Sequence, residues 1–125
     1  MHKALLDGWH LLIVEDEYLV AAELAAALED FGAVVLAPAG SVRDALDRVA
    51  HAGKRIDAAV LDINLRGESV YPVAAKLTEL NVPFVFTTGY DAESIPTPYA
   101  AAPRLEKPAD IGQLVRILEK TLRAA

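Results

Sequence analysis

Five polar residues in this sequence have the types and the spacing needed for phosphoryl chemistry. Glu15 and Asp16 directly follow the first of several short apolar runs, Asp62 and Thr88 follow later runs, and Lys107 follows the last one. Carboxylates held within a few ångströms repel one another, and Mg²⁺, which prefers oxygen ligands, relieves that repulsion. A carboxylate is also a competent nucleophile, and phosphoryl transfer depends mainly on positioning and charge neutralisation. Brought together, these residues could transfer a phosphoryl group to an aspartate beside Mg²⁺.

Each of the five residues has an ordinary structural explanation when it is taken alone. Glu15 and Asp16 could cap a helix and favour the positive end of its dipole. Asp62 could be a loop acid, Thr88 a turn residue and Lys107 a solvated surface charge. The functional interpretation therefore depends on whether the fold places all of them at matching strand ends.

Short apolar runs alternate five times with segments of helical periodicity. The runs predict strands at residues 10–14, 33–37, 56–61, 82–87 and about 103–106. The residues expected to face inward from the helices are Val20, Leu24, Ala27, Leu28 and Phe31, then Val42, Ala45, Leu46 and Val49, then Val73, Ala74, Leu77 and Leu80, and finally Ile111, Leu114, Val115, Leu118 and Leu122. Ser41 and Asp110 are expected to cap the second and the last helix. This alternation predicts an α/β fold with a parallel sheet and helices on both faces, and ligands bind such sheets at the carboxyl ends of the strands.

The segment before the last strand is unsuited to a helix of normal length because it contains Pro96, Pro98 and Pro103. Proline lacks an amide hydrogen and pushes the preceding residue out of helical geometry. We therefore expect the fourth helix to be short or replaced by a loop, with at most one helical turn between about residues 91 and 102.

The length and composition of the chain fit one folded domain. Its 125 residues suffice for a single core, and a hydrophobic content of 54% excludes a disordered chain. The net charge of −6 argues against nucleic-acid binding, which requires a basic face. No apolar run reaches the roughly 20 residues that cross a membrane, and the first residues do not form a signal peptide. The absence of cysteine fits a reducing compartment, so we expect a cytoplasmic protein.

Four segments together resemble the receiver domains of bacterial two-component response regulators. They are residues 12–17, 60–67, 82–90 and 105–108, and the resemblance covers about residues 9–123 of what we expect to be a single domain over residues 1–125. It implies a flavodoxin-like, doubly wound sheet of five parallel strands in the order 2-1-3-4-5. It also implies a phosphoprotein that catalyses only its own phosphorylation and dephosphorylation and is not otherwise an enzyme.

The resemblance assigns a role to each residue of the phosphoryl site. Asp62 is the phosphoacceptor, and Thr88 and Lys107 contact the phosphoryl group. Gly89 stands where the family has a small residue that leaves room for phosphate. The family also has a cis peptide bond between the lysine and the proline that follows it, here Pro108.

The same resemblance implies a Mg²⁺ site at the phosphoacceptor. Asp16 is expected to bind the metal directly and Glu15 mainly through water. The backbone carbonyl of Asn64 completes the protein ligands together with Asp62.

A narrower resemblance concerns a subgroup of single-domain regulators of α-proteobacteria that is known by a Phe-Ala-Thr-Gly-X-Tyr motif. Residues 83–90 and 66–74 are similar to this subgroup, except that Thr87 replaces the alanine and Tyr90 directly follows Gly89. The implied phosphodonor is a sensor histidine kinase of the HWE or a related class, in stress or developmental signalling. The resemblance also implies a histidine phosphotransfer protein or a downstream protein target as a further partner.

The switch position of the family is unusual in this chain. Receiver domains have Tyr or Phe three residues before the lysine, where the ring moves inward on phosphorylation, and this chain has Arg104. We therefore expect Tyr90 or Tyr99 to report the phosphorylation state instead.

Two kinds of function remain from the sequence, with the first preferred. A single-domain response regulator would act as a signalling switch or a phosphate shuttle, and the alternative is a receiver-like adaptor that is never phosphorylated. A phosphatase of the dehalogenase type would need an acid where Asn64 stands. A flavin-binding protein would need a phosphate-binding loop after the first strand, where Glu15, Asp16 and Glu17 repel phosphate.

Overall fold

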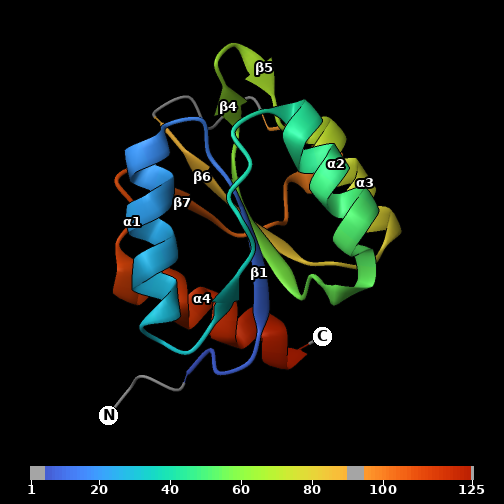
Figure 1. Cartoon of the computed structure of the whole chain (residues 1–125). Coiled ribbons are helices and arrows are strands. Elements are labelled where there is room, and N and C mark those ends of the chain that lie inside the picture. Colours follow the sequence, from blue (N-terminus) through green and yellow to red (C-terminus); the bar gives the residue numbers. More distant parts are fainter. Residues whose placement is uncertain (1–4, 90–94, 125) are drawn as a thin grey trace.

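The computed structural model of the chain describes residues 5–89 and 95–124. A parallel sheet lies between two layers of helices (Figure 1), with α1 and α4 against one face and α2 and α3 against the other. In spatial order the strands are β2 (Val34–Val35), β1 (His10–Val14), β3 (Ala58–Asp62), β6 (Phe84–Thr88) and β7 (Arg104–Glu106). Counted within this sheet alone, the strand order is 2-1-3-4-5. The predicted doubly wound topology is therefore confirmed.

Two of the four α-helices that the structure describes, α2 and α4, begin directly after residues whose side chains cap them. The bounds of the four are α1 (Tyr18–Glu29), α2 (Val42–Ala52), α3 (Tyr71–Glu79) and α4 (Ile111–Ala124), and short 3₁₀ turns occupy η1 (Gly53–Arg55) and η3 (Thr97–Tyr99). The Ser41 hydroxyl accepts the Asp44 amide at 3.0 Å, and the Asp110 carboxylate accepts the Gln113 amide at 3.0 Å. Both predicted caps are confirmed. None of the helices in the described ranges combines the length and the apolar character needed to span a bilayer.

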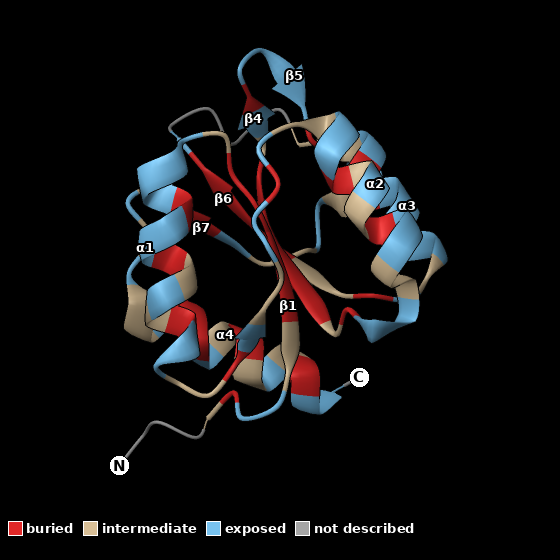
Figure 2. Ribbon diagram, in the orientation of Figure 1, coloured by how far each residue is buried: buried red, intermediate tan, exposed pale blue. Residues whose placement is uncertain are grey.

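The central strands are buried on both faces, which explains why they read as continuous apolar runs. Along β1, Leu11 and Ile13 pack into the cluster under α1 and α4, whereas Leu12 and Val14 pack into the cluster under α2 and α3. The same alternation runs along β3 and β6, and Figure 2 shows these strands as the buried centre of the fold. This two-sided core fixes the register that aligns the carboxyl ends of the strands.

The predicted inward stripe of the first helix was wrong at one position. Val20 is 36% exposed, and its neighbour Ala21 is buried instead. The helix begins at Tyr18. Its first two residues, Tyr18 and Leu19, are apolar and are also exposed to solvent. Val20 matches the helical stripe because it is spaced four residues from the buried Leu24, but it lies too near the start of the helix to be covered.

The core also begins earlier than residue 9, where the family resemblance begins. Leu6 is fully buried in the cluster under α1 and α4, and its amide donates to the Phe31 carbonyl at 2.9 Å. Gly32 permits this approach because it has a φ of +96° and a Cβ there would lie 2.7 Å from the Asp7 Cα.

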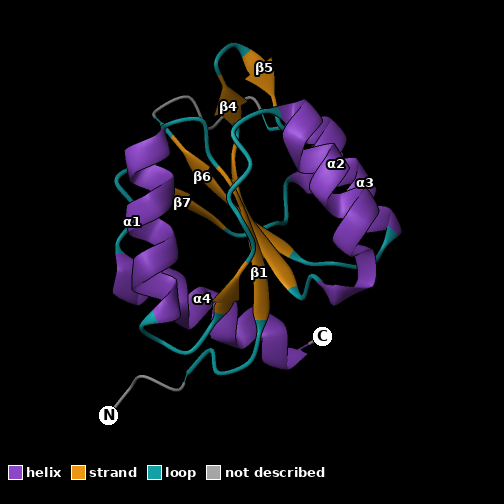
Figure 3. Cartoon of the chain, in the orientation of Figure 1, coloured by secondary structure: helices purple, strands orange, loops and turns teal. Residues whose placement is uncertain are grey.

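A small hairpin that was not predicted from the sequence follows β3. Strand β4 (Asn64–Leu65) pairs with the antiparallel strand β5 (Glu68–Ser69), and Figure 3 shows this hairpin beyond the carboxyl edge of the sheet. Its turn consists of Arg66 and Gly67, both with positive φ, which is the geometry of tight hairpins.

Between β6 and β7 the structure describes Gly89 and residues 95–103. There the only helical element among the described residues is the 3₁₀ turn η3, so the expectation of at most one helical turn is confirmed for residues 95–102. Residues 91–94 of the same expectation lie outside the described ranges.

Candidate functional site

Three carboxylates meet at the carboxyl edge of the sheet. Glu15 and Asp16 directly follow β1, and Asp62 is the last residue of the adjacent strand β3. One oxygen from each residue can be chosen so that all three lie within 4.8 Å of one another. Glu15 and Asp62 are each only 4% exposed. The structure therefore brings together three of the residues that the sequence suggested, in an environment that penalises unpaired charge.

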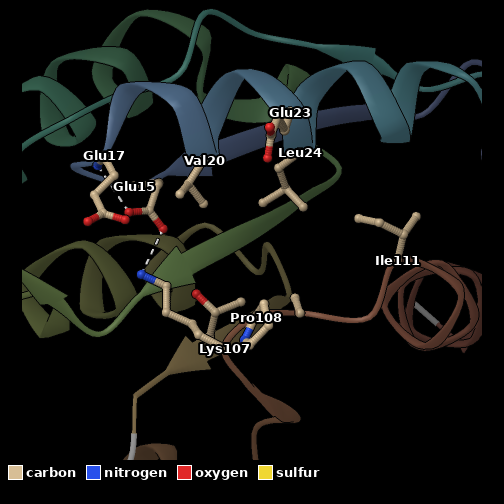
Figure 4. A pocket seen from close by; sticks show the side chains of 10 residues that line it. Glu15, Glu17, Val20, Glu23, Leu24, Lys107, Pro108 and Ile111 are labelled. Atoms are coloured by element: carbon tan, nitrogen blue, oxygen red, sulfur yellow. Dashed lines mark hydrogen bonds and ion pairs between the residues drawn. The ribbon is translucent and has the colours of Figure 1, made fainter.

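Lys107 reaches this group from the loop after β7. Its Nζ lies 3.0 Å from Asp62 Oδ2 and 3.1 Å from Glu15 Oε1, and Figure 4 shows the contact with Glu15. Partial burial by itself would lower the pKa of the Lys107 ammonium, but the hydrogen bonds to Asp62 and Glu15 raise it above its ordinary value. Lys107 is therefore a firmly charged cation between two acidic strand ends. Its peptide bond to Pro108 is cis, as the family resemblance implied.

Burial raises the pKa of the Glu15 carboxyl, although the Glu17 amide, at 3.0 Å, and Lys107 act in the opposite direction. The ionised form of Glu15 therefore gains from further positive charge in the site. Lys107 supplies one positive charge for three carboxylates, and carboxylate oxygens are the ligands that Mg²⁺ prefers. The residues present fit a Mg²⁺ ion.

Asp16 differs from the other two acids in its partner. Its ion-pair partner is Arg66, from the turn of the β4–β5 hairpin. Arg66 is not among the site residues predicted from the sequence. The available signal was an Arg-Gly pair two residues after Asn64, which fits a tight turn, but the pattern does not show where the side chain extends.

Thr88 and Asn64 border the acidic group. Thr88 ends β6 and is 4% exposed, and its carbonyl accepts the Lys107 amide at 2.8 Å. The Asn64 amide donates to Asp62 Oδ1 at 3.3 Å, while the Asn64 side-chain oxygen accepts the Gly67 amide at 2.8 Å. The backbone at both residues thus connects directly to the charged cluster.

The expected switch residues lie elsewhere. Tyr99 stacks on Tyr71 with ring centroids 5.6 Å apart and an angle of 5° between the rings. The rings of Tyr99 and Phe86 form a T-shaped pair with centroids 6.4 Å apart. Arg104 is exposed at the start of β7, in register with Phe86. Both therefore lie on the α2 and α3 side of the sheet, whereas Tyr90 lies outside the described residues.

A cavity of about 450 Å³ opens beside the acidic group, between α1 and the start of α4 (Figure 4). Glu15 and Lys107 line its charged end, and Val20, Leu24 and Ile111 line its apolar part. One end of the cavity is therefore charged, and the surface next to that end is apolar.

Comparisons with known proteins agree with this arrangement. No protein-family model matches the chain. The chain is 33% identical over 115 residues to the sensory transduction protein LytT of Enterococcus faecalis, and this match covers 89% of the chain but only 47% of LytT. The chain thus spans about half the length of that relative.

Solved structures extend the likeness over nearly whole chains. SdrG from Sphingomonas melonis is 38% identical, with a TM-score of 0.78, and the match covers 95% of this chain and 98% of SdrG. A response regulator receiver protein from Sinorhizobium medicae is 26% identical with a TM-score of 0.79, and the match covers 94% and 96% of the two chains.

Proposed function

We propose that this chain, which belongs to the receiver domains of response regulators, accepts a phosphoryl group from a histidine kinase onto the Asp62 carboxylate in a Mg²⁺-dependent reaction. The observation that carries the proposal is the contact of Asp62 with Lys107 beside two further acids at the sheet edge. In this function the domain acts as a signalling switch or a phosphate shuttle.

The transfer itself needs little beyond positioning and charge. A carboxylate oxygen of Asp62 attacks the phosphorus atom, and the bond from phosphorus to the donor histidine nitrogen breaks as the imidazole leaves with the electron pair. The Lys107 ammonium neutralises charge on the phosphoryl oxygens, and the Thr88 hydroxyl donates a hydrogen bond to them. The buried setting of Asp62 strengthens each of these interactions because less water competes for them.

The acidic residues have a second role in this proposal. Asp16, Asp62 and the backbone carbonyl of Asn64 would hold Mg²⁺, with Glu15 contributing mainly through water. When bound, the ion supplies the positive charge that offsets repulsion between these carboxylates and the incoming phosphoryl group. The close grouping of the three carboxylates supports this assignment.

We further propose that the phosphodonor is a protein that docks beside α1. A donor histidine can reach Asp62 only if its protein covers the rim of the site. Tyr18 and Leu19, at the start of α1 next to that rim, are 81% and 72% exposed, and Val20 continues this apolar surface into the cavity. Exposed apolar residues that adjoin one another are a recognised sign of protein contact.

The motif at residues 83–90 supports a more specific proposal. We assign the chain to the α-proteobacterial Phe-Ala-Thr-Gly-X-Tyr subgroup, with a kinase of the HWE or a related class as donor and the receiver domain working without a fused output domain. Phosphotransfer profiling against the histidine kinases of the source organism tests this assignment, and a preference for another kinase class would contradict it.

The central test uses a small phosphodonor. Incubation with acetyl phosphate and Mg²⁺ should raise the intact mass by one phosphoryl unit, and the label should be base-labile. Asp62→Asn should abolish the increase, as should removal of Mg²⁺ with a chelator. The matched control Asp47→Asn, on the exposed surface of α2, should label like the wild type. Labelling that survives Asp62→Asn would refute the acceptor assignment, and an unlabelled wild type would favour the adaptor alternative.

A further inference from the structure

We propose that Arg66 is a built-in counter-ion for Asp16 that competes with Mg²⁺ and so sets the metal concentration at which the site fills. The inference rests on the proposed function, since it assumes that Asp16 is a metal ligand. Arg66 Nε lies 3.8 Å from Asp16 Oδ2, and Arg66 Nη2 lies 3.4 Å from the Asp16 carbonyl oxygen, although 50 residues separate the two in sequence. The guanidinium therefore contacts both the carboxylate and the backbone at this position.

The hairpin holds Arg66 where it can reach the site. Leu65, the residue before it, is 2% exposed and anchors the hairpin in the core. The Gly67 amide donates to the Asn64 side chain at 2.8 Å, and the Val70 amide closes the base of the hairpin on the Ile63 carbonyl at 2.9 Å. Arg66 itself has a φ of +53°, which is uncommon for a residue with a side chain. The turn is thus fixed at both sides, and its arginine extends back over the carboxyl edge of the sheet.

The two cations of the site divide the three acids between them. Lys107 pairs with Glu15 and Asp62 at 3.1 and 3.0 Å, and its side chain is 29% exposed. Arg66 pairs with Asp16 at the longer distance of 3.8 Å, and its side chain is 80% exposed. Of the three acids in the site, Asp16 therefore has the counter-ion that is easiest to displace. Because Arg66 is the more exposed and more distant of the two cations, it can move away from its acid while Lys107 stays in place.

The affinity of the site for Mg²⁺ should therefore depend on the charge of Arg66. Replacing Arg66 with an uncharged residue removes a competing cation from Asp16, so Mg²⁺ should bind more tightly. Because exposed ion pairs are worth little, the expected gain is about 1.5- to 5-fold in the dissociation constant. The gain should shrink at high ionic strength because salt screens charges that are exposed to solvent.

The test is a calorimetric Mg²⁺ titration of the wild type, Arg66→Gln, Arg66→Lys and Arg55→Gln. Arg55 is exposed in η1, at the opposite end of the fold, so its variant changes the net charge equally without touching the site. We expect tighter binding for Arg66→Gln, near wild-type binding for Arg66→Lys, which keeps the charge, and no change for Arg55→Gln. The rate of phosphorylation by acetyl phosphate at saturating Mg²⁺ should be the same for Arg66→Gln and the wild type.

Each other outcome has a distinct meaning. Weaker Mg²⁺ binding by Arg66→Gln would overturn the inference and indicate that Arg66 orients Asp16 for the metal. Equal binding, or an equal gain in Arg55→Gln, would also overturn it, because the effect would then be absent or due to net charge alone. A slower reaction at saturating Mg²⁺ would indicate that Arg66 contacts the phosphoryl group instead. A wild type that binds no Mg²⁺ would refute the proposed function itself, together with the inference.

Discussion

The Lys107 ammonium lies 3.0 Å from Asp62 Oδ2, although 45 residues separate Lys107 from Asp62 in the sequence. The same nitrogen lies 3.1 Å from Glu15 Oε1, so a single cation joins the loop after β7 to the ends of β1 and β3. The side chains of both acids are almost fully buried, whereas that of Lys107 is 29% exposed. The pair is therefore a structural connection across the sheet as well as part of the proposed phosphoryl site.

Lys107→Met should destabilise the protein by about 2 kcal/mol in the absence of Mg²⁺. Removing one partner of a fully buried ion pair typically costs about 3–5 kcal/mol, and we reduce this value because Lys107 is partly exposed. Urea unfolding measures the loss. Saturating Mg²⁺ should recover part of it, because the ion supplies positive charge to the same acids. A variant as stable as the wild type without Mg²⁺ would contradict this account of the site.

Asp16→Ala should weaken Mg²⁺ binding more than Glu15→Ala does. A direct ligand loses a coordination bond, whereas a ligand that acts through water loses only the orientation of that water. Glu15 is also the more firmly held acid, because it contacts Lys107 at 3.1 Å and the Glu17 amide at 3.0 Å, whereas the ion pair of Asp16 with Arg66 is longer, at 3.8 Å. Parallel titrations of the two variants provide the comparison, and equal losses would contradict this division of roles.

The strand ends could be predicted from the sequence because the central strands are buried on both faces. Such strands read as uninterrupted apolar runs, so the residue types change sharply at Glu15 and after Leu61. Helix α1 was harder to predict because its buried stripe consists of Ala21, Leu24 and Leu28, while Val20 is exposed. The exposed apolar residues at its start imitate a core pattern, and only the three-dimensional packing separates the two.

The missed parts of the site depend on side-chain reach or on backbone geometry. The carboxyl ends of parallel strands lie along one edge of the sheet, so topology predicts that Asp62 and Lys107 share that edge. Arg66 is different because it approaches Asp16 only as a result of the tight turn in the β4–β5 hairpin. The burial of Leu6 was missed for a similar reason, since it depends on the local approach of the chain at Gly32.

Leu19→Lys should slow phosphotransfer from the cognate histidine kinase and leave labelling by acetyl phosphate unchanged. Leu19 is 72% exposed beside the acidic group, so a lysine there disrupts an apolar contact with a protein donor but does not reach the buried Asp62. Initial rates with the two donors measure the difference.

Val34→Lys is the matched control for that variant, because Val34 is also an exposed apolar residue but lies on β2, away from the start of α1. It should transfer like the wild type from both donors. If Leu19→Lys reacts as slowly with acetyl phosphate as with the kinase, the defect lies in the site itself rather than in docking.

Tyr71→Phe should stabilise the protein by about 1 kcal/mol at neutral pH, because in the described part of the chain the Tyr71 hydroxyl is buried without a hydrogen-bond partner. Burial also raises the pKa of Tyr71 above its ordinary value of 10.0, against a smaller opposing effect of Arg104. The folded state therefore favours the neutral phenol, and the wild type loses this contribution as the pH rises through the raised pKa. The stability difference between variant and wild type should widen above about pH 10.

Urea unfolding at a series of pH values measures the Tyr71→Phe effect. Tyr18→Phe is the control, since Tyr18 is 81% exposed and its hydroxyl is free to bond with water. A Tyr71→Phe variant that is less stable than the wild type at neutral pH would indicate that the hydroxyl has a partner after all.

We expect Tyr99 to report the phosphorylation state of the domain. The 3₁₀ turn η3 is held mainly by bonds within itself, such as that from the Tyr99 amide to the Pro96 carbonyl at 2.9 Å. The Tyr99 ring attaches it to the body of the domain by packing on Tyr71 and against Phe86. The flanking residues Ile95 and Ala102 pack on the same core cluster. Phe86 lies two residues before Thr88 on β6, so a shift of Thr88 toward a new phosphoryl group would be transmitted directly to this contact.

Hydrogen exchange should therefore change over residues 95–104 when beryllium fluoride, a phosphoryl mimic, is added with Mg²⁺, and should stay constant over α2. Tyr99→Ala should increase exchange over the same residues by about two- to ten-fold without the mimic, because an aromatic pair contributes about 0.5–1.5 kcal/mol to holding the turn in place. In that variant the mimic should cause a smaller further change, since the contact it acts on has been removed. If the mimic alters protection only around Asp62 and leaves residues 95–104 as they were, Tyr99 does not report the state of the site.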